Sequence, residues 1–312
     1  MEIFLCRNDE IAFQLVTESA VLSSVLMEEA TAIFERERRR LIGLAYSFLG
    51  SHSEAEDIVQ DAWLRFHEAV DGMRQPEAWL TTVVSRLALD RLRSAQHRRE
   101  TYPGVWLPEP VSALPDPEST HAARSLLSIG FLHLLEKLRP EERAVVVLRN
   151  AFDRSYEEIA AVIGKTEAAC RQMLSRAQRR LREEGAGRLG SAPQAVVQQC
   201  IEALAAEDEQ RLLALLADDA ILYGDGGGRV PSVLNPIYGA ARISHFFLGL
   251  LRKYPNRFRS QITWANGQPA MLVTSDAHPS VLAVSFAGNR ITAFHLISNP
   301  EKLSAFALAS VC

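Results

Sequence analysis

Apolar residues recur with a helical period over most of the first 184 positions of the chain. Residues 55–66 show this best, because their apolar positions fall on one face and the other face carries Glu56, Asp57, Gln60, Asp61 and Arg65. Ser53 is the predicted N-cap of this helix, and Glu56 completes a capping box. Asp71-Gly72 predicts a turn, and Pro76 suits the first turn of a helix with its body at residues 77–93. Residues 29–97 are therefore predicted to form an all-helical unit.

The helical pattern stops at residues 101–120, where Pro103, Gly104, Pro108, Pro110, Pro115 and Pro117 fall close together. That density excludes a helix and predicts a linker or an ordered, extended strap. The sequence WLPEP at residues 106–110 places a tryptophan in this linker, and a large aromatic side chain in such a place normally docks on a folded part. Residues 185–193, GAGRLGSAP, predict a second linker that is flexible.

Residues 155–181 predict two helices around a glycine. Ser155 and Glu158 form a capping box, Gly164 supplies the turn, and Thr166 caps a second helix that ends near Leu181. The predicted inner faces are Ile159, Ala160, Val162 and Ile163 in the first helix, and Ala169, Met173 and Ala177 in the second. This is the pattern of a helix-turn-helix, whose second helix enters the major groove of DNA. An ordinary helical hairpin is the alternative.

The second helix of this pair carries the residues expected to reach DNA. Arg and Gln can read base edges, and arginines such as Arg176, Arg179 and Arg180 can hold phosphates. The residues predicted to face outward at its start are Lys165, Thr166, Glu167, Ala168, Arg171, Gln172, Ser175 and Arg176.

After residue 193 the pattern changes to that of a mixed α+β domain. One or two helices are predicted over residues 194–217. Strand patterns separated by Gly, Asn and Pro turns follow at residues 221–223, 261–264, 270–274, 281–286 and 290–297. We expect a curved sheet packed against helices.

Charge and cysteine content narrow the class of protein. The net charge is −4, yet residues 165–182 hold six basic residues and one acid, and residues 86–99 hold five and one. Basic stripes in an acidic chain fit a protein that meets DNA with one face only, although solvated helix faces look the same.

Because Cys6, Cys170, Cys200 and Cys312 are far apart, we expect no disulfide and no metal site, and a buried, inert thiol at Cys170. We also expect no cofactor. Without a signal peptide or a membrane-spanning apolar run, a cytoplasmic location is expected.

Several segments together resemble the sigma-70 family in its extracytoplasmic-function (ECF) group. Residues 55–63, 76–80 and 90–93 resemble region 2, and residues 124–184 resemble region 4, with no region 3 between them. The sequences at residues 106–110, 225–229 and 299–303 resemble a subgroup with a fused C-terminal SnoaL-like domain. The resemblance implies two all-α sigma domains and then a cone-shaped α+β domain of the cystatin/NTF2-like kind. The expected divisions are 1–28 (no assigned role), 29–97 (region 2), 98–123 (linker), 124–184 (region 4), 185–192 (linker) and 193–312 (SnoaL-like).

The resemblance also implies partners and roles. The polymerase β′ clamp helices would bind Glu56, Asp57, Gln60 and Asp61, and the β flap would also contact the sigma factor. The −10 promoter element would meet Trp79, Arg86, Asp90, Arg91 and Arg93, although Trp79 is at a spacing that favours the core. The −35 element would meet the outward residues from Lys165 to Arg176. Regulatory contacts between domains would be made by Trp106, Leu107, Pro108, Glu109, Pro110, Asp225, Gly226, Gly227, Gly228, Arg229, Asn299, Pro300, Glu301, Lys302 and Leu303.

The C-terminal domain resembles domains with a pocket inside the cone, for which the candidate lining residues are His245, Asp276, His278 and His295. No spacing of acids and histidines indicates catalysis, so we expect no enzyme and no catalytic residue, and a small-molecule ligand stays open. Our hypothesis is regulation in cis by docking of this domain on the other two. The alternatives are a helix-turn-helix regulator that works without polymerase, and an isomerase-like enzyme fused to a DNA-binding module.

Overall fold

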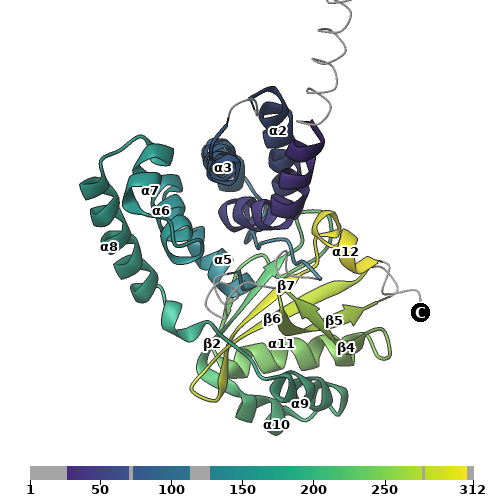
Figure 1. Ribbon diagram of the computed structural model, residues 1–312. Helices are drawn as coiled ribbons and strands as arrows, with labels where there is room; N and C mark the ends of the chain where they lie inside the picture. Colours follow the sequence, from purple (N-terminus) through teal and green to yellow (C-terminus); the bar gives the residue numbers. More distant parts are fainter. Residues whose placement is uncertain (1–26, 70–72, 113–126, 276–277, 308–312) are drawn as a thin grey trace, which may run out of the picture.

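The computed structural model describes residues 27–69, 73–112, 127–275 and 278–307 (Figure 1). A first helical module (residues 27–100) and a second helical module (residues 127–184) stand beside each other on one side of a sheet. An extended segment, here called the strap (residues 101–112), leads out of the first module, and the sheet belongs to a C-terminal domain (residues 190–307). The predicted fold class, two all-α parts followed by an α+β domain, is confirmed.

The first module consists of a helix over residues 27–49, α2 (His52–Ala69) and α3 (Pro76–Glu100). Pro76 begins α3, as predicted, because a proline at the first helical position gives up no hydrogen bond. The predicted cap of α2 is wrong. The helix begins one residue before Ser53, and the hydroxyl of Ser51 accepts the N–H of Glu54 at 3.4 Å.

The second module consists of α5 (Ile129–Leu135), α6 (Pro140–Asn150), α7 (Tyr156–Ile163) and α8 (Glu167–Glu183). The helix-turn-helix is confirmed: Ser155 and Glu158 form the capping box, Gly164 ends α7 in the left-handed conformation, and Thr166 caps α8. The predicted inner stripe of α8 is partly wrong, since Cys170, Leu174, Ala177 and Leu181 are buried, whereas Ala169 and Met173 are half-buried. In α7 only Ile159 and Ile163 of the predicted four are fully buried.

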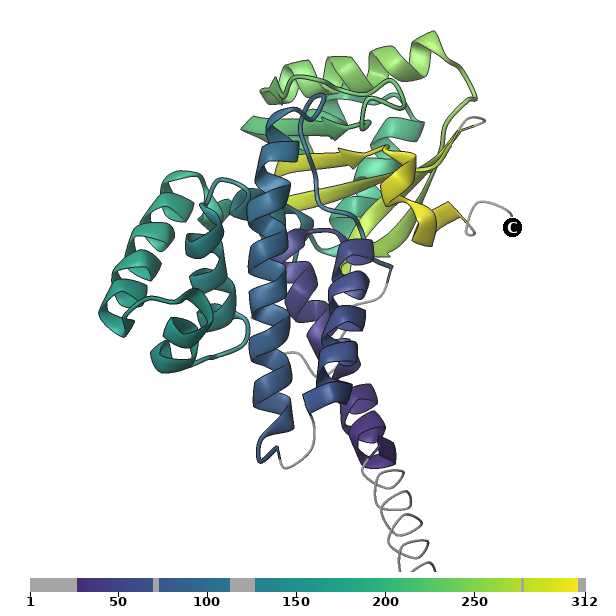
Figure 2. The same cartoon turned by 90° about the horizontal axis from the view of Figure 1, so that it is seen from above.

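The two modules share one hydrophobic core, which runs from Ala30 in the first to Leu181 in the second. Figure 2 shows α3 between the second module and the other helices of the first module. Helix α3 packs on α2 on one side and on α6 and α7 on the other. The modules therefore form a single packed unit in this structure.

The described parts of both predicted linkers have a defined backbone conformation. The strap is extended and its residues Leu107 to Pro110 are buried, in agreement with the prediction of an ordered strap. The prediction of a flexible second linker is wrong, because residues 186–188 form a 3₁₀ turn and Gly190-Ser191 forms strand β1, which pairs with β6. Arg188 anchors the turn through an ion pair with Asp219 at 2.6 Å.

The C-terminal domain begins with α9 (Gln194–Ala205) and α10 (Glu209–Leu215) and continues into the sheet. The strands are β2 (Leu216–Asp225), β3 (Ile237–Tyr238), β4 (Arg259–Ala265), β5 (Gln268–Thr274), β6 (Ser280–Ala287) and β7 (Arg290–Ile297). Their order is β3-β2-β7-β6-β5-β4; β2 and β7 are parallel and the other pairs antiparallel. A helix that the sequence reading did not identify, α11 (Ala240–Lys253), connects β3 to β4, and the chain continues to a 3₁₀ turn (Pro300–Lys302) and α12 (Ser304–Ala307).

The two faces of the sheet pack against different parts of the molecule. Helices α9, α10 and α11 pack on one face, where Leu222, Met271, Leu282 and Phe294 point. Side chains that alternate with these, such as Ala270, Leu272 and Val281, point to the opposite face and pack with Leu107 of the strap and Ile129 of α5. The sheet therefore lies between its own helices and the sigma-like modules (Figure 1).

Some predictions fall outside the described residues: the Asp71-Gly72 turn, residues 1–26, residues 113–123 of the first linker, and Asp276. Within the described ranges, no helix combines the length and apolar character needed to cross a bilayer. The same part of the chain contains no group of three His, Cys, Asp or Glu side chains placed to hold a metal ion.

Candidate functional site

Asp225, at the end of β2, is the centre of the contacts between the strap and the C-terminal domain. Its carboxylate is 1% exposed and accepts hydrogen bonds from the hydroxyl of Tyr102 at 2.6 Å and from the backbone N–H of Leu107 at 2.9 Å. The ammonium of Lys302 approaches it to 2.7 Å. Burial, and the hydrogen bond to Asp225, raise the pKa of Tyr102 above its ordinary value. These donors compensate for the cost of burying the charged carboxylate, and because two of them belong to the strap, they fix its position.

Lys302 completes this site from the C-terminal end of the domain. Its ammonium also donates to the carbonyl of Leu107 at 2.5 Å and lies 4.1 Å from the ring centre of Trp106, a cation–π geometry. Asn299 donates its side-chain amide to the hydroxyl of Tyr102 at 3.0 Å. A Cβ on Gly227 would lie 2.4 Å from that amide nitrogen, so the loop can approach Asn299 only with a glycine there. Arg229 and Glu301 close the rim with an exposed ion pair.

The three sequences singled out at residues 106–110, 225–229 and 299–303 are thus in contact with one another. The first of them also reaches the first module. Glu109 accepts the N–H of His52 at 2.8 Å and so satisfies a free donor at the start of α2, in addition to the cap that Ser51 provides. The ring of Trp106 lies over Gly50, where a Cβ would come within 2.8 Å of it.

Asn266 is a residue that the sequence reading missed. It occupies the turn between β4 and β5 with φ of 54° and is fully buried. Its amide nitrogen donates to the hydroxyl of Tyr46 and to the carbonyl of Leu127, both at 2.7 Å, and its amide oxygen accepts the N–H of Val111 at 3.1 Å. One side chain therefore joins the first module, the strap and the start of the second module. An Asn-Gly pair between strands signals a hairpin, but nothing in the sequence signals these partners.

We call the contacts of α3 with α6 and α7 the module interface. Arg86 donates to the carbonyl of Ala161 at 2.8 Å, and Arg93 pairs with Glu141 at 2.8 Å. Partial burial alone would raise the pKa of Glu141, but the hydrogen bond from Arg93 outweighs it and the pKa of Glu141 is lowered. The same hydrogen bond raises the pKa of Arg93. Two arginines predicted to contact −10 DNA are therefore bound to the second module.

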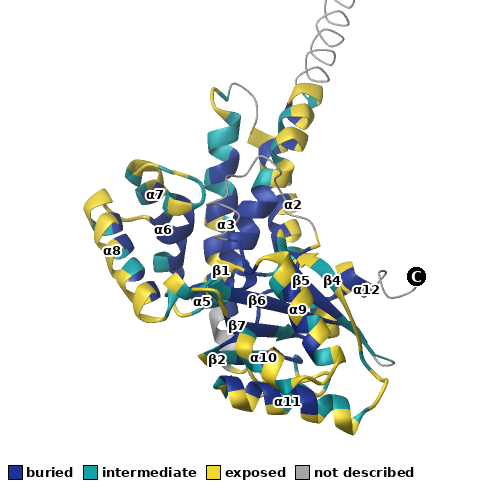
Figure 3. Ribbon diagram, turned by 90° about the horizontal axis from the view of Figure 1, so that it is seen from below, coloured by how far each residue is buried: buried dark blue, intermediate teal, exposed yellow. Residues whose placement is uncertain are grey.

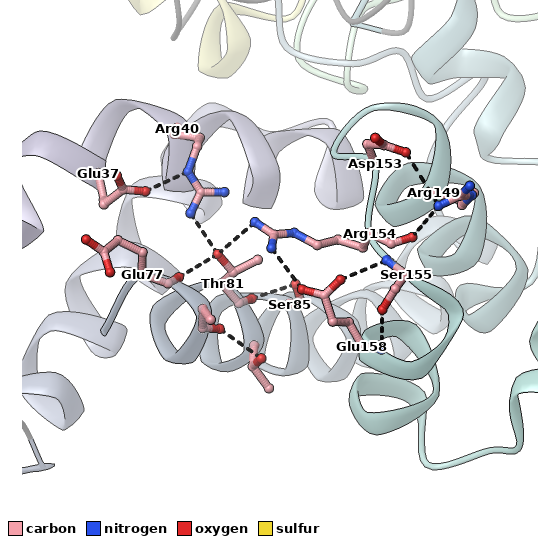
Figure 4. A network of polar contacts seen from close by, with 12 residues as sticks. Glu37, Arg40, Glu77, Thr81, Ser85, Arg149, Asp153, Arg154, Ser155 and Glu158 are labelled. Carbon is pink, nitrogen blue, oxygen red and sulfur yellow. Dashed lines mark hydrogen bonds and ion pairs between the residues drawn. The ribbon is translucent and has the colours of Figure 1, made fainter. Parts of the chain in front are cut away.

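A second group of polar contacts crosses between the modules where the helix over residues 27–49 meets α3 (Figure 4). The hydroxyl of Thr81 accepts from Arg40 at 2.7 Å and from Arg154 at 3.5 Å. Deeper in the structure, Arg143 is 1% exposed, donates to the carbonyl of Ser47 and pairs with Glu136. These contacts combine with the shared core to hold the modules together.

The other predicted −10 residues have local partners. Trp79 is half-buried and packs on Phe66, with ring centres 5.8 Å apart, in agreement with a core position. Arg91 faces Glu54 at 3.7 Å, and Asp90 accepts from Arg93 at 3.0 Å.

The predicted polymerase-binding face of α2 is open to solvent. Glu56, Asp57, Gln60 and Asp61 are all exposed, and Leu64, one turn further along, is 58% exposed. Acidic and amide groups around an exposed leucine fit a partner surface with basic and apolar side chains.

The predicted −35 residues are also exposed. They cover the outer side of α8 and the turn before it, away from α6 (Figure 3), and are Lys165, Thr166, Glu167, Ala168, Arg171, Gln172, Ser175 and Arg176. Cys170, between them in sequence, is buried, and burial raises the pKa of its thiol, as expected for an inert cysteine.

The three candidate pocket residues that the structure describes do not meet. His245 is exposed on α11, His278 is half-buried near Ser275, and Asp276 is outside the described residues. His295 is buried and points to the sheet face opposite α11, since side chains alternate along a strand and its neighbour Phe294 packs on Phe247 of α11. Among these three residues, the structure therefore assembles no catalytic group.

Comparisons with known proteins agree with this arrangement. Residues 33–98 match the family model of sigma-70 region 2, and residues 129–181 match that of sigma-70 region 4. The ECF RNA polymerase sigma factor SigJ of Mycobacterium tuberculosis is 38% identical over 287 residues, which cover 87% of this chain and 92% of SigJ. The probable ECF RNA polymerase sigma factor SigI of the same species is 32% identical over 284 residues, which cover 88% and 95%.

A solved structure extends the likeness to the whole arrangement. The crystal structure of Mycobacterium tuberculosis SigJ matches with a TM-score of 0.73 at 33% identity, covering 89% of this chain and 99% of that one. Both helical modules and the C-terminal domain lie within this match. The chain therefore belongs to the extracytoplasmic-function sigma factors of the sigma-70 family, in the subgroup with a fused SnoaL-like domain.

Proposed function

We propose that this sigma factor directs core RNA polymerase to promoters through its two modules, and that the C-terminal domain holds it in a closed state that cannot engage the −10 element. The exposed face of Glu56, Asp57, Gln60 and Asp61 would meet the β′ clamp helices, and the second module would meet the β flap and the −35 element. The C-terminal domain would act by binding and not by catalysis.

The main support for the closed state is that Arg86 and Arg93 are both hydrogen-bonded to the second module. Both are candidates for holding −10 DNA, yet Arg86 donates to Ala161 and Arg93 to Glu141 of the second module. Phosphates would compete with the second module for these guanidinium groups, so DNA binding through them favours separation of the modules. The faces assigned to polymerase and to the −35 element are exposed, which supports polymerase binding first and separation afterwards.

The C-terminal domain favours the closed state because it contacts the modules and the strap together. Asp225 and Lys302 fix the strap between the modules, and Asn266 bonds to Tyr46 and to Leu127, one from each module. Separation of the modules would cost part of these contacts, so the domain shifts the equilibrium toward the closed state.

Transcription with purified core polymerase tests the proposal. Glu141→Arg places a like charge against Arg93, so we expect transcription from a promoter-containing genomic fragment to increase severalfold. Asp153→Arg is the control, because Asp153 is 95% exposed and pairs with Arg149 of its own module. Truncations after residue 190 and after residue 298 should also change transcription. Equal transcription from the full chain, Glu141→Arg and both truncations would contradict regulation in cis.

Binding of polymerase and DNA is tested separately. We expect Asp57→Lys with Asp61→Lys to abolish association with core polymerase, and promoter DNA to be retained in a gel shift only when core polymerase is present. Tight promoter binding without polymerase would instead favour a regulator that works alone.

A further inference from the structure

Three aromatic side chains meet where the second module contacts the sheet. His133 of α5 lies with its ring centre 4.6 Å from that of Tyr223 on β2 and 5.5 Å from that of His295 on β7. Tyr223 and His295 stack at 5.4 Å. We call these three residues the histidine cluster. It places two imidazoles from different domains against each other.

The fit between α5 and the sheet leaves little room at this point. A Cβ on Gly130 would lie 2.5 Å from the hydroxyl of Ser285 and 3.3 Å from the ring of His295, so α5 can lie this close only with a glycine there. His295 is 2% exposed, and its Nδ1 meets no hydrogen-bond partner among the described residues. A positive charge on that ring would have no acceptor at Nδ1 while α5 stays in place.

Protons can reach the cluster. His133 is half-buried and lines a cavity of about 100 Å³, together with Tyr223, His295, Lys137, Glu184 and Arg188. This volume is large enough to admit water molecules.

The charges around the cluster do not compensate for protonation. Burial lowers the pKa of His133 to about 4; Glu136 and Asp225 oppose that shift and Lys137 adds to it. Burial and the neighbouring His133 lower the pKa of His295 well below its ordinary value. Among the other nearby groups, Arg188 is paired with Asp219. Burial, Tyr238 and Glu184 raise the pKa of Tyr223, and Arg188 opposes that rise.

We infer that the histidine cluster is a proton-sensitive contact that keeps the second module on the C-terminal domain only while both imidazoles are neutral. When α5 lifts from the sheet, both rings enter water and regain their ordinary basicity, so protons bind the open form more tightly and favour it. The contact is fully present above pH about 6.5 and is lost as the pH falls from there toward about 4. Acidification would thus be one signal that opens the closed state.

The linkage predicts the size of the effect. For a histidine with a pKa near 4 when closed and about 6.5 when open, the opening constant rises about fourfold between pH 7.5 and pH 6.0. His295, whose pKa in the closed form also lies well below its ordinary value, adds a factor of about the same size. Together the two histidines raise the opening constant about 14-fold, since the factors multiply when both charge on opening.

Hydrogen exchange of the full-length protein measures this opening even when it is rare. We expect the protection factors of α5 amides such as that of Leu132, corrected for intrinsic exchange, to fall about 14-fold between pH 7.5 and pH 6.0. Amides of α11, at Phe247 and Leu248, report global unfolding, which frees the same two histidines. Their protection factors should fall by at least as much, but should exceed those of α5 at both pH values, because α5 opens without global unfolding. Protection factors of α5 that stay constant between the two pH values, or that equal those of α11, would overturn the inference.

Variants that remove one titrating group sharpen the test. In His133→Gln the fall of the α5 protection factors between pH 7.5 and pH 6.0 should shrink to about fourfold. In the control His245→Gln, which changes an exposed histidine, the fall should be the same as in the unaltered chain. The full fall persisting in His133→Gln would also overturn the inference. His295→Gln offers the same measurement if His133→Gln does not fold. The inference rests on the proposed regulation in cis. Its failure can be told apart from failure of that proposal, because the transcription tests above are made at one pH and the exchange measurements compare two.

Discussion

Two sets of contacts that join the parts of the molecule differ in burial and in chemistry. The strap is bound by Asp225 and Asn266, which are buried and hydrogen-bonded, and by the half-buried Lys302. The polar contacts of the module interface at Arg86 and Arg93 are ion pairs and hydrogen bonds at the surface, beside the hydrophobic core that both modules share. Exposed ion pairs contribute little and weaken with salt, whereas breaking a buried pair is costly. The strap contacts therefore suit a permanent attachment, and the polar contacts at Arg86 and Arg93 are the part of the module interface that is lost at the least cost.

The largest expected effect is that of Asp225→Ala. The variant removes the carboxylate that pairs with the half-buried ammonium of Lys302 and accepts the hydroxyl of Tyr102, while Lys302 keeps its hydrogen bond to the carbonyl of Leu107. We expect the free energy of unfolding, measured in urea, to fall by about 4 kcal/mol. Glu301→Gln, which removes only the exposed pair with Arg229, is the control and should cost less than about 0.5 kcal/mol. Similar losses in the two variants would remove the distinction between buried and exposed contacts.

Asn266→Gly is expected to cost about 3 kcal/mol, because it removes the acceptor of the Val111 N–H, the donor to the Leu127 carbonyl and one of the two partners of the Tyr46 hydroxyl. Glycine keeps a backbone that tolerates positive φ. Asn289→Gly makes the same change in the β6–β7 turn, where Asn289 has φ of 70° and is exposed. That control should be nearly neutral in the same urea titration. If both variants were neutral, the three-way contact of Asn266 would not contribute to stability.

The pH dependence of stability comes next in size. Burial lowers the pKa of His133 to about 4, so the folded state favours the neutral ring. The stabilisation is complete above pH about 6.5 and declines toward pH 4, with a loss of about 2 kcal/mol between pH 7.5 and pH 5 from this residue alone. Unfolding titrations of the chain and of His133→Gln should differ by this amount. Parallel pH profiles would contradict it.

The smallest effect is expected at the module interface. A double-mutant cycle of Arg93→Ala and Glu141→Ala should give a coupling energy of about 0.5 kcal/mol that decreases in high salt. A coupling of several kcal/mol, independent of salt, would place this interface with the buried contacts and would contradict the comparison above.

Local signals in the sequence predicted the local structure well. The capping box of Ser155 and Glu158, the turn at Gly164 and the strands of the C-terminal domain follow from short-range spacing. The wrong predictions concern features that depend on residues far away in the sequence. Glu109 hydrogen-bonds to the start of α2 from more than 50 positions away, and the packing of α8 on α6 buries Cys170 and Leu174 in place of Ala169 and Met173.

The contacts of the site were predictable only in part. The unusual tryptophan in a proline-rich segment indicated that the strap docks, and the structure brings Trp106 to Lys302. Nothing in the sequence connects Asn266 with Tyr46, or His133 with His295, because each pair is joined only by the packing of separate domains.

The order of these parts along the chain has a consequence during protein synthesis. Both modules are complete by residue 184, but Lys302 leaves the ribosome 118 residues later. At translation rates of 5–20 residues per second, the interval is roughly 6 to 24 s. During that time the nascent polypeptide holds finished DNA-reading helices whose restraining partner has not yet been made.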